Sequence, residues 1–343
     1  MQILVVGGAG YIGSHMAKWL VNDGHEVVVL DNLSTGHAAA ARYGRFVTGD
    51  LANRAGLESL FARYTFAAVM HFGAFSQVAE SMVDPARYYA NNVANTLNLL
   101  EVMHAHDAPV LVFSSTAAVY GEPETASLRE DHPLRPINPY GRSKRMVEEI
   151  LEDYGKAYGL RWAALRYFNA AGADPGGALG EQHDPETHLI PIILQVAAGK
   201  RSELALYGDD YDTPDGTCIR DYVHVLDLCA AHVRAMDHLL AGGVSRAWNL
   251  GNGSGFSVAE VLSVARSVTG KEIPTRVMPR RPGDPARLVA DSAAARQLLG
   301  WETLFAELET IIHHAWHWEC RRRCNGLQSK TVCSHSTGFF GSD

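Results

Sequence analysis

The segment Ile3–Gly13 reads ILVVGGAGYIG, an apolar run followed by glycines in the spacing G-x-x-G-x-x-G. This pattern predicts a buried strand, a tight turn and a helix that begins near Tyr11. Such a turn lets the backbone approach a pyrophosphate, and a helix N-terminus favours its negative charge. Asp31 follows 18 residues after Gly13, where a carboxylate can bind the adenosine ribose 2′-OH and would repel a 2′-phosphate. We therefore expect NAD rather than NADP; the alternative is a structural turn and a helix-capping aspartate.

Apolar runs alternate with helical periods over the first half of the chain. The runs predict buried strands at Ile3–Val6, Val27–Leu30, Phe46–Thr48, Ala67–His71, Val110–Ser114 and Trp162–Arg166. The helical periods predict helices at Tyr11–Asn22, Arg54–Tyr64, Pro85–His106 and Tyr140–Tyr158. This alternation predicts an α/β fold, a Rossmann-type doubly wound parallel sheet.

The rhythm changes after Asn169 and predicts a second, smaller α/β domain for the substrate. We expect residues 1–169 to form the NAD-binding domain, with 217–250 contributing elements, and residues 170–318 to form the second domain. Val225–Leu240 and Ala247–Leu250 are the segments expected to return to the first domain.

Residues 319–343 differ in composition, with three consecutive arginines and three of the five cysteines. We expect this tail to be disordered and outside the fold. Cys320, Cys324, Cys333 and His335 match no common zinc-finger spacing, so no metal site is expected.

The bulk composition excludes several classes of function. The chain has 343 residues, is 47% hydrophobic and carries a formal net charge of −8, which disfavours nucleic acid or an anionic membrane as a partner. No apolar run approaches the ~18 residues that a membrane helix needs. Ile3–Val6 stops at glycine without a basic leader, so we expect no signal peptide and a cytoplasmic protein.

Three residues predict a catalytic site. Tyr140 and Lys144 are spaced i, i+4 and so share one helical face, and Thr116 follows a predicted strand. A free phenol titrates near ~10, so we expect Lys144 to lower the pKa of Tyr140, with Thr116 binding a substrate hydroxyl. An exposed Tyr–Lys pair is the bland alternative. Hydride removal to NAD with proton transfer to tyrosinate gives a ketone, and hydride return to the opposite face inverts a sugar carbon.

At these residues the chain resembles the extended short-chain dehydrogenases and, more narrowly, the UDP-glucose 4-epimerase family, over about residues 1–318. The segments that carry the resemblance are GGAGYIGSH (Gly7–His15), DNLS (Asp31–Ser34), YYANN (Tyr88–Asn92), SSTAAVYG (Ser114–Gly121), PYGRSK (Pro139–Lys144), RYFN (Arg166–Asn169) and YGDDYDTPDGTCIRDYVHV (Tyr207–Val225).

The resemblance implies C4 epimerisation of UDP-glucose and UDP-galactose, a homodimer, Tyr140 as the base, Lys144 as its electrostatic partner and Thr116 as an assisting hydroxyl. Together with their positions at strand ends, it gives the expected NAD contacts: Gly7, Gly10, Tyr11, Ile12, Gly13, Asp31, Asn32, Asp50, Leu51, Phe72, Gly73, Ala74, Asn91, Ser114, Tyr140, Lys144 and Phe168. The implied UDP-sugar contacts are Thr116, Tyr140, Asn169, Leu189, Tyr207, Arg220, Tyr222, Arg281 and Asp284.

The sequence departs from the family pattern at two positions, and three competing functions remain to be considered. Ser76 replaces a lysine found in several relatives, and Leu288 replaces a bulky tyrosine, so N-acetylated sugars are not excluded. A nucleotide-sugar 4,6-dehydratase would carry Asp-Glu where this chain has Ala117 and Ala118. An epimerase of UDP-GlcNAc and UDP-GalNAc is the second competing function, and a binding protein that senses NAD without catalysis is the third.

Overall fold

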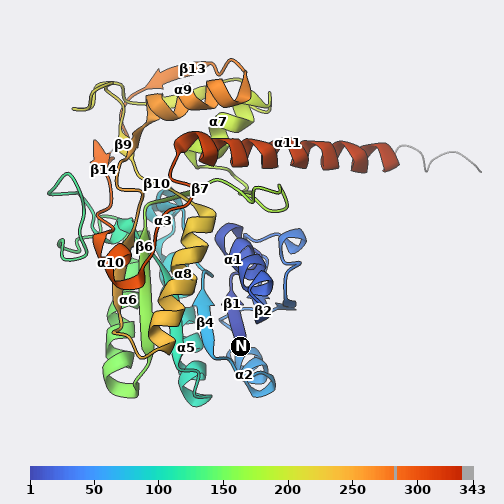
Figure 1. Ribbon diagram of the computed structural model, residues 1–343, viewed down its shortest axis with the longest axis vertical. Helices are drawn as coiled ribbons and strands as arrows, with labels where there is room; N and C mark the ends of the chain where they lie inside the picture. The colour runs from blue at the N-terminus through green and yellow to red at the C-terminus, as the bar shows by residue number, and fades with distance from the viewer. Residues whose placement is uncertain (282–283, 334–343) are drawn as a thin grey trace, which may run out of the picture.

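A seven-stranded parallel sheet forms the centre of the molecule. The computed structural model describes residues 1–281 and 284–333. The strands lie in the order β11-β6-β5-β4-β1-β2-β3; of these, β6, β4, β1 and β2 are labelled in Figure 1. Their bounds are β1 Gln2–Val6, β2 Glu26–Asp31, β3 Arg45–Thr48, β4 Ala68–His71, β5 Val110–Thr116, β6 Arg161–Tyr167 and β11 Arg246–Leu250. All six strands predicted in the first half of the chain are confirmed, as is the Rossmann-type fold.

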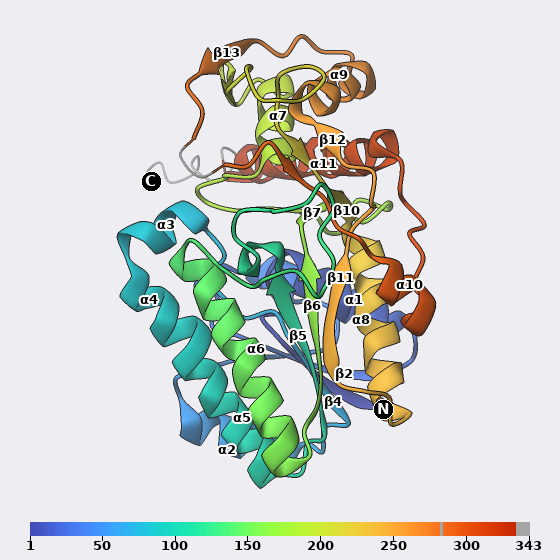
Figure 2. The same cartoon turned by 90° about the vertical axis from the view of Figure 1, so that its left-hand side faces the viewer.

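Helices cover both faces of this sheet, which explains why its strands are continuous apolar runs. In β1, Ile3 and Val5 face the cluster under α1 (Tyr11–Asn22) and α8 (Val225–Leu240). Leu4 and Val6 face the opposite cluster. That second face is covered by α2 (Arg54–Arg63), α5 (Asn95–Ala105) and α6 (Pro139–Tyr158), as Figure 2 shows.

The helix expected at Pro85–His106 is interrupted. The structure has α4 at Pro85–Tyr89, a π-helical turn at Ala90–Ala94 and then α5, with a further short helix, α3, at Val78–Val83. Inside the turn, the Asn92 amide donates to the carbonyl of Phe75 at 3.0 Å and to Ser143 Oγ at 3.1 Å, and its Oδ1 accepts from the Phe75 N–H at 3.0 Å. The wider turn directs this side chain into the protein instead of along the helix.

The remaining elements form a smaller layer over the carboxyl ends of the sheet (Figures 1 and 2). Its core is built from α7 (Leu189–Ala197), α9 (Val258–Thr269) and α11 (Leu308–Cys333). The short strands are β7 Asn169–Ala171, β8 Leu204–Tyr207, β9 Ile219–Arg220, β10 Tyr222–His224, β12 Phe256–Ser257, β13 Thr275–Met278 and β14 Arg287–Leu288, and α10 at Ala293–Leu299 packs back on α8. None of the described helices has the length and apolar content that a membrane crossing requires.

The start of the expected disordered tail belongs to a helix. α11 continues through Cys333, and Glu319 is buried on the same helical face as Ile312 and Ala315. Glu319 forms ion pairs with Lys200 and Arg322. The boundary expected after residue 318 is therefore wrong. A glutamate does not look like a core residue in the sequence, but in the fold Lys200 and Arg322 neutralise Glu319 and allow it to be buried. Residues 334–343, including His335, lie outside the described residues.

Candidate active site

A large cleft opens where the carboxyl ends of the sheet meet the smaller layer. Its volume is about 1070 Å³. All seventeen residues expected to contact NAD border it. Of the expected substrate contacts, Thr116, Tyr140, Asn169, Tyr207, Arg220, Arg281 and Asp284 border it as well. The structure thus brings together residues from the first and second halves of the chain.

Leu189 and Tyr222 are the two expected substrate contacts that do not border the cleft. The Tyr222 side chain is buried and belongs to the core of the smaller layer. Leu189, the first residue of α7, packs against the same core. The expectation rested on their positions in matched segments, and position along a segment does not specify the direction of a side chain.

The glycine turn after β1 is packed too closely for any side chain. A Cβ at Gly7 would lie 2.6 Å from the Gly73 nitrogen, and a Cβ at Gly13 would lie 2.2 Å from the Gly7 oxygen. Gly7 also has a φ of +77°, which favours glycine. These contacts keep the turn flat at the rim of the cleft and hold the N-terminus of α1 beside it.

Asp31, at the end of β2, stabilises this turn by hydrogen bonds. Its Oδ2 accepts from the Ala9 N–H at 2.9 Å, and its Oδ1 accepts from the Leu33 N–H at 2.8 Å. The side chain caps no helix in the structure and remains at the edge of the cleft. Its bonds to the turn and its position at the cleft fit a dinucleotide site in which one carboxylate shapes the loop and faces the ribose.

Tyr140 and Lys144 lie in the first turns of α6, which begins at a capped end. Asn138 Oδ1 accepts from the Gly141 N–H at 2.8 Å, and Pro139 occupies the first helical position. A Cβ at Gly141 would lie 2.4 Å from the Ala118 carbonyl oxygen, so glycine lets the helix approach the loop after β5. This approach places Tyr140 and Lys144 beside the end of β5.

The end of β5 supplies hydrogen-bond partners to both catalytic candidates. The buried Lys144 Nζ donates to the Ser114 carbonyl at 2.9 Å and lies 4.8 Å from the centre of the Phe113 ring. The Thr116 side chain lies near the Tyr140 hydroxyl, where a hydrogen bond lowers the pKa of the phenol, and its Oγ1 accepts from the Ala118 N–H at 3.2 Å. The three residues expected to carry catalysis therefore occupy one corner of the cleft.

Burial dominates the electrostatics of this corner. It raises the pKa of Tyr140, against the hydrogen bond from Thr116, which lowers it. Burial also lowers the pKa of Lys144 to about 7, against the nearby Glu148 carboxylate, which raises it. The expected lowering of the Tyr140 pKa by Lys144 is thus not seen, because the low-dielectric surroundings penalise both charged forms. A phenolate here requires further positive charge beside the ring.

Two arginines line the opposite part of the cleft. Arg220 pairs with Asp284 and donates from Nη1 to the Ile219 carbonyl at 2.7 Å. The Arg281 guanidinium lies over the Tyr207 ring, 3.8 Å from its centre. Because the whole chain is acidic, these local cations are the groups suited to an anionic ligand. A guanidinium on an aromatic face also offers a surface for a planar base.

The positions that separate the competing functions also border the cleft. Ala117 and Ala118 follow Thr116 there, and neither can donate or accept a proton. Ser76 and Leu288 line the same cleft, so the two departures noted in the sequence lie where a substrate would bind.

The sequence did not predict several parts of the lining, among them the segment between β7 and α7. Glu181, His183, Glu186, Thr187 and His188 all border the cleft. Their sequence resembles a polar loop, and no common motif has this spacing.

A sequence model described as "NAD dependent epimerase/dehydratase family" matches residues 3–251. The chain belongs to this family. Among curated members, the UDP-glucose 4-epimerase of Halalkalibacterium halodurans is 52% identical over 318 residues, which cover 93% of this chain and 95% of the relative. That of Streptococcus mutans is 52% identical over 321 residues, with 93% and 96% covered.

Solved structures of family members share the whole architecture. The UDP-glucose 4-epimerase from Brucella ovis in complex with NAD has a TM-score of 0.91 and 51% identity, covering 92% of this chain and 98% of that one. The enzyme from Bifidobacterium longum in complex with NAD⁺ and UDP has a TM-score of 0.88 and 37% identity, covering 94% and 99%. The resemblance to UDP-glucose 4-epimerases that the sequence motifs indicated is confirmed.

Proposed function

We propose that this family member interconverts UDP-glucose and UDP-galactose by NAD-dependent epimerisation at C4. The observation that carries the proposal is the shared cleft. The glycine turn with Asp31, the Tyr140–Lys144–Thr116 corner and the arginine wall all border it. A dinucleotide, a sugar hydroxyl and a diphosphate would each meet suitable groups there.

The residues present fit NAD. The turn at Gly7 and Gly13 excludes any side chain, and the Asp31 carboxylate at the cleft edge disfavours a 2′-phosphate. When bound, NAD accepts hydride from the sugar carbon and returns it.

Tyr140 is the base in this proposal. Tyr140 is half-buried, and the neighbouring Thr116 hydroxyl, which lowers the pKa of the phenol, can pass a proton between the sugar hydroxyl and Tyr140. Lys144 lies one helical turn away and adds positive charge when protonated. The oxidised nicotinamide ring is also cationic, so NAD and Lys144 together would oppose the burial that raises the Tyr140 pKa.

Arg220, Arg281 and Tyr207 would hold the UDP moiety. A dehydratase mechanism has no support at Ala117 and Ala118 because elimination of water needs an ionisable acid and base.

A second activity on UDP-N-acetylhexosamines is favoured by one residue. Leu288 borders the cleft and is smaller than a tyrosine. A solved relative at 45% identity is named as a UDP-Glc/GlcNAc 4-epimerase. Leu288→Tyr should then lower turnover of UDP-GlcNAc more than turnover of UDP-glucose, as product analysis of both reactions would show.

From the family resemblance we further infer a homodimer, and from the sequence pattern a cytoplasmic location. Light scattering coupled to gel filtration tests the first inference, and fractionation of the native cells tests the second.

Purified protein incubated with UDP-galactose, without added NAD, tests the main proposal. We expect UDP-glucose to form, because the cofactor is regenerated in every cycle and should remain bound. Protein that carries NAD but forms no product would instead support a cofactor-sensing role.

A further inference from the structure

Four side chains of metal-ligating types meet in the irregular segment between β7 and α7. They are Glu181, His183, Glu186 and His188, all within eight residues of sequence. One ligand atom from each lies within 4.8 Å of the others. None of the four has a role in the chemistry proposed above.

Four histidine–carboxylate contacts in this group are close to the spacing of neighbouring ligands around a tetrahedral metal ion. His188 Nδ1 lies 2.9 Å from Glu181 Oε1 and 3.1 Å from Glu186 Oε1. His183 Nδ1 lies 3.3 Å from Glu181 Oε1 and 3.6 Å from Glu186 Oε2. Ligands about 2.0–2.1 Å from a zinc ion at tetrahedral angles are about 3.3 Å apart.

The burial of the two carboxylates also favours a central cation, although Glu186 Oε1 already accepts from the N–H groups of Thr187 and His188 at 2.9 and 3.0 Å. The side chains of Glu181 and Glu186 are only 7% and 2% exposed, and two buried carboxylates at close range need a cation between them. In the described part of the chain, their ion pairs are with His183 and His188 alone. His183 Nδ1 is buried and makes no hydrogen bond despite its short contacts.

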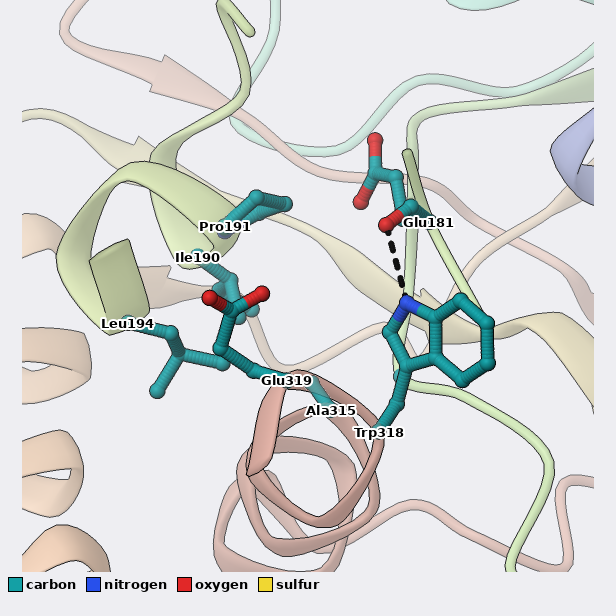
Figure 3. Close-up of a pocket in the computed structure, with 8 residues that line it drawn as sticks. Glu181, Ile190, Pro191, Leu194, Ala315, Trp318 and Glu319 are labelled. Carbon is teal, nitrogen blue, oxygen red and sulfur yellow. Dashed lines mark hydrogen bonds between the residues drawn. The ribbon is translucent and has the colours of Figure 1, made fainter. Parts of the chain in front are cut away.

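Residues outside this group of four hydrogen-bond the main chain of the segment. The four side chains are therefore not needed to hold the segment in place and can share a common partner. Trp318 Nε1 on α11 donates to the Glu181 carbonyl at 3.2 Å. In Figure 3 the Glu181 carboxylate points away from this indole, to the other side of its backbone. Arg201 Nη2 donates a hydrogen bond to the Glu186 carbonyl at 3.3 Å.

We propose that Glu181, His183, Glu186 and His188 form a zinc site. Imidazole and carboxylate ligands in a tetrahedral group suit Zn²⁺, whereas Mg²⁺ and Ca²⁺ prefer oxygen ligands in larger number. Two carboxylates and two neutral imidazoles balance the charge of the ion. Because protein fills all four positions, the site is structural, and it fixes the segment that walls the cleft beside α7.

Zinc titration of the full-length chain tests this proposal. The protein, treated with chelator and free of any affinity tag, carries Cys320→Ser, Cys324→Ser and Cys333→Ser so that the three C-terminal cysteines cannot compete. Zn²⁺ binding is followed by calorimetry and metal analysis, and Co²⁺ by its visible spectrum. We expect one Zn²⁺ per chain and a tetrahedral Co²⁺ spectrum.

Single variants assign the ligands. Because even an outer partner of a metal ligand is worth roughly 10–100-fold in affinity, His183→Gln and Glu186→Gln should each weaken zinc binding at least about a hundredfold. His104→Gln, an exposed histidine on α5, is the matched control and should not change affinity. Circular dichroism and bound NAD report whether each variant is folded, independently of epimerase activity.

The competing explanation is a pair of imidazolium–carboxylate contacts. Burial lowers the pKa of His183 and His188, but the two carboxylates outweigh it and raise the values to about 9 and about 10. Absence of stoichiometric zinc binding, or binding that survives in both folded variants, would overturn the proposal in favour of these contacts.

Discussion

The Tyr140 hydroxyl is the group on which the proposed chemistry depends, and its removal leaves the ring in place. Tyr140→Phe should lower kcat for UDP-galactose by at least a hundredfold, since positioned acid–base groups contribute roughly 10²–10⁴-fold. Bound NAD should persist, because the glycine turn and Asp31 are unchanged. Turnover within a few fold of the parent protein, measured by product formation, would refute Tyr140 as the base.

Arg220 tests the opposite wall of the cleft. Arg220→Ala should weaken UDP binding by roughly tenfold to a hundredfold, the range of a charge-assisted hydrogen bond to phosphate, about 1.5–3 kcal/mol. It also leaves Asp284 without its partner, so the double variant Arg220→Ala/Asp284→Ala separates loss of a cation from gain of an unpaired anion. Calorimetry with UDP measures both, and an unchanged affinity in the double variant would remove Arg220 from the site.

At the scale of elements, α6 connects helix capping to catalysis. Asn138 satisfies the N–H of Gly141 in the turn that carries Tyr140. Asn138→Ala should reduce the free energy of unfolding by about 1 kcal/mol and lower kcat with little change in bound NAD. Asn138→Asp keeps the accepting oxygen and should restore most of both quantities. Urea unfolding and product assays decide this, and equal stability of all three proteins would contradict the capping role.

The elements also show where sequence reasoning succeeds. The bounds predicted for α1 agree with the structure, Tyr11–Asn22, because this helix buries one apolar face continuously, and the segment Val225–Leu240, expected to return to the first domain, forms α8 against the sheet. The interruption at Ala90–Ala94 was not predictable, since Asn92 bonds to Phe75 and Ser143, which adjoin it only in the folded chain.

In the candidate site, too, some residues could be predicted from the sequence and others could not. Glycines and hydroxyls at strand ends could be placed from the alternating pattern, because parallel strands bring their carboxyl ends to one edge. The directions of Leu189 and Tyr222 could not. The four-residue group around Glu181 depends on Trp318, more than a hundred residues away in the sequence.

For the whole molecule, buried histidines set the response to acid. Burial lowers the pKa of four of them: His15 and His232 to about 4, His71 and His224 to about 3. Below pH ~6.5 the unfolded chain takes up protons that the folded chain does not, so the free energy of unfolding falls as the pH drops toward 4. Each histidine contributes up to about 1.4 kcal/mol per pH unit.

Urea midpoints measured at pH 7.5, 6.5 and 5.5 check this dependence. They should change little between the first two values and fall steeply between the last two. His71→Gln, whose amide can reach the position of Nε2 and keep a hydrogen bond to Thr96, should show a smaller decline below pH 6.5. Parallel slopes for the two proteins would show that His71 is not among the responsible groups.

The seventh strand, β11, has a consequence for biosynthesis. β11 pairs with β6 but is synthesised about 80 residues after it. At 5–20 residues per second, this separation corresponds to roughly 4–16 s. During that interval the backbone edge of β6 has no neighbour and can pair with another nascent chain. A chain stopped just before Arg246 should therefore aggregate, whereas one stopped after Leu250 should aggregate less; equal sedimentation of the two would show that the edge is protected in another way.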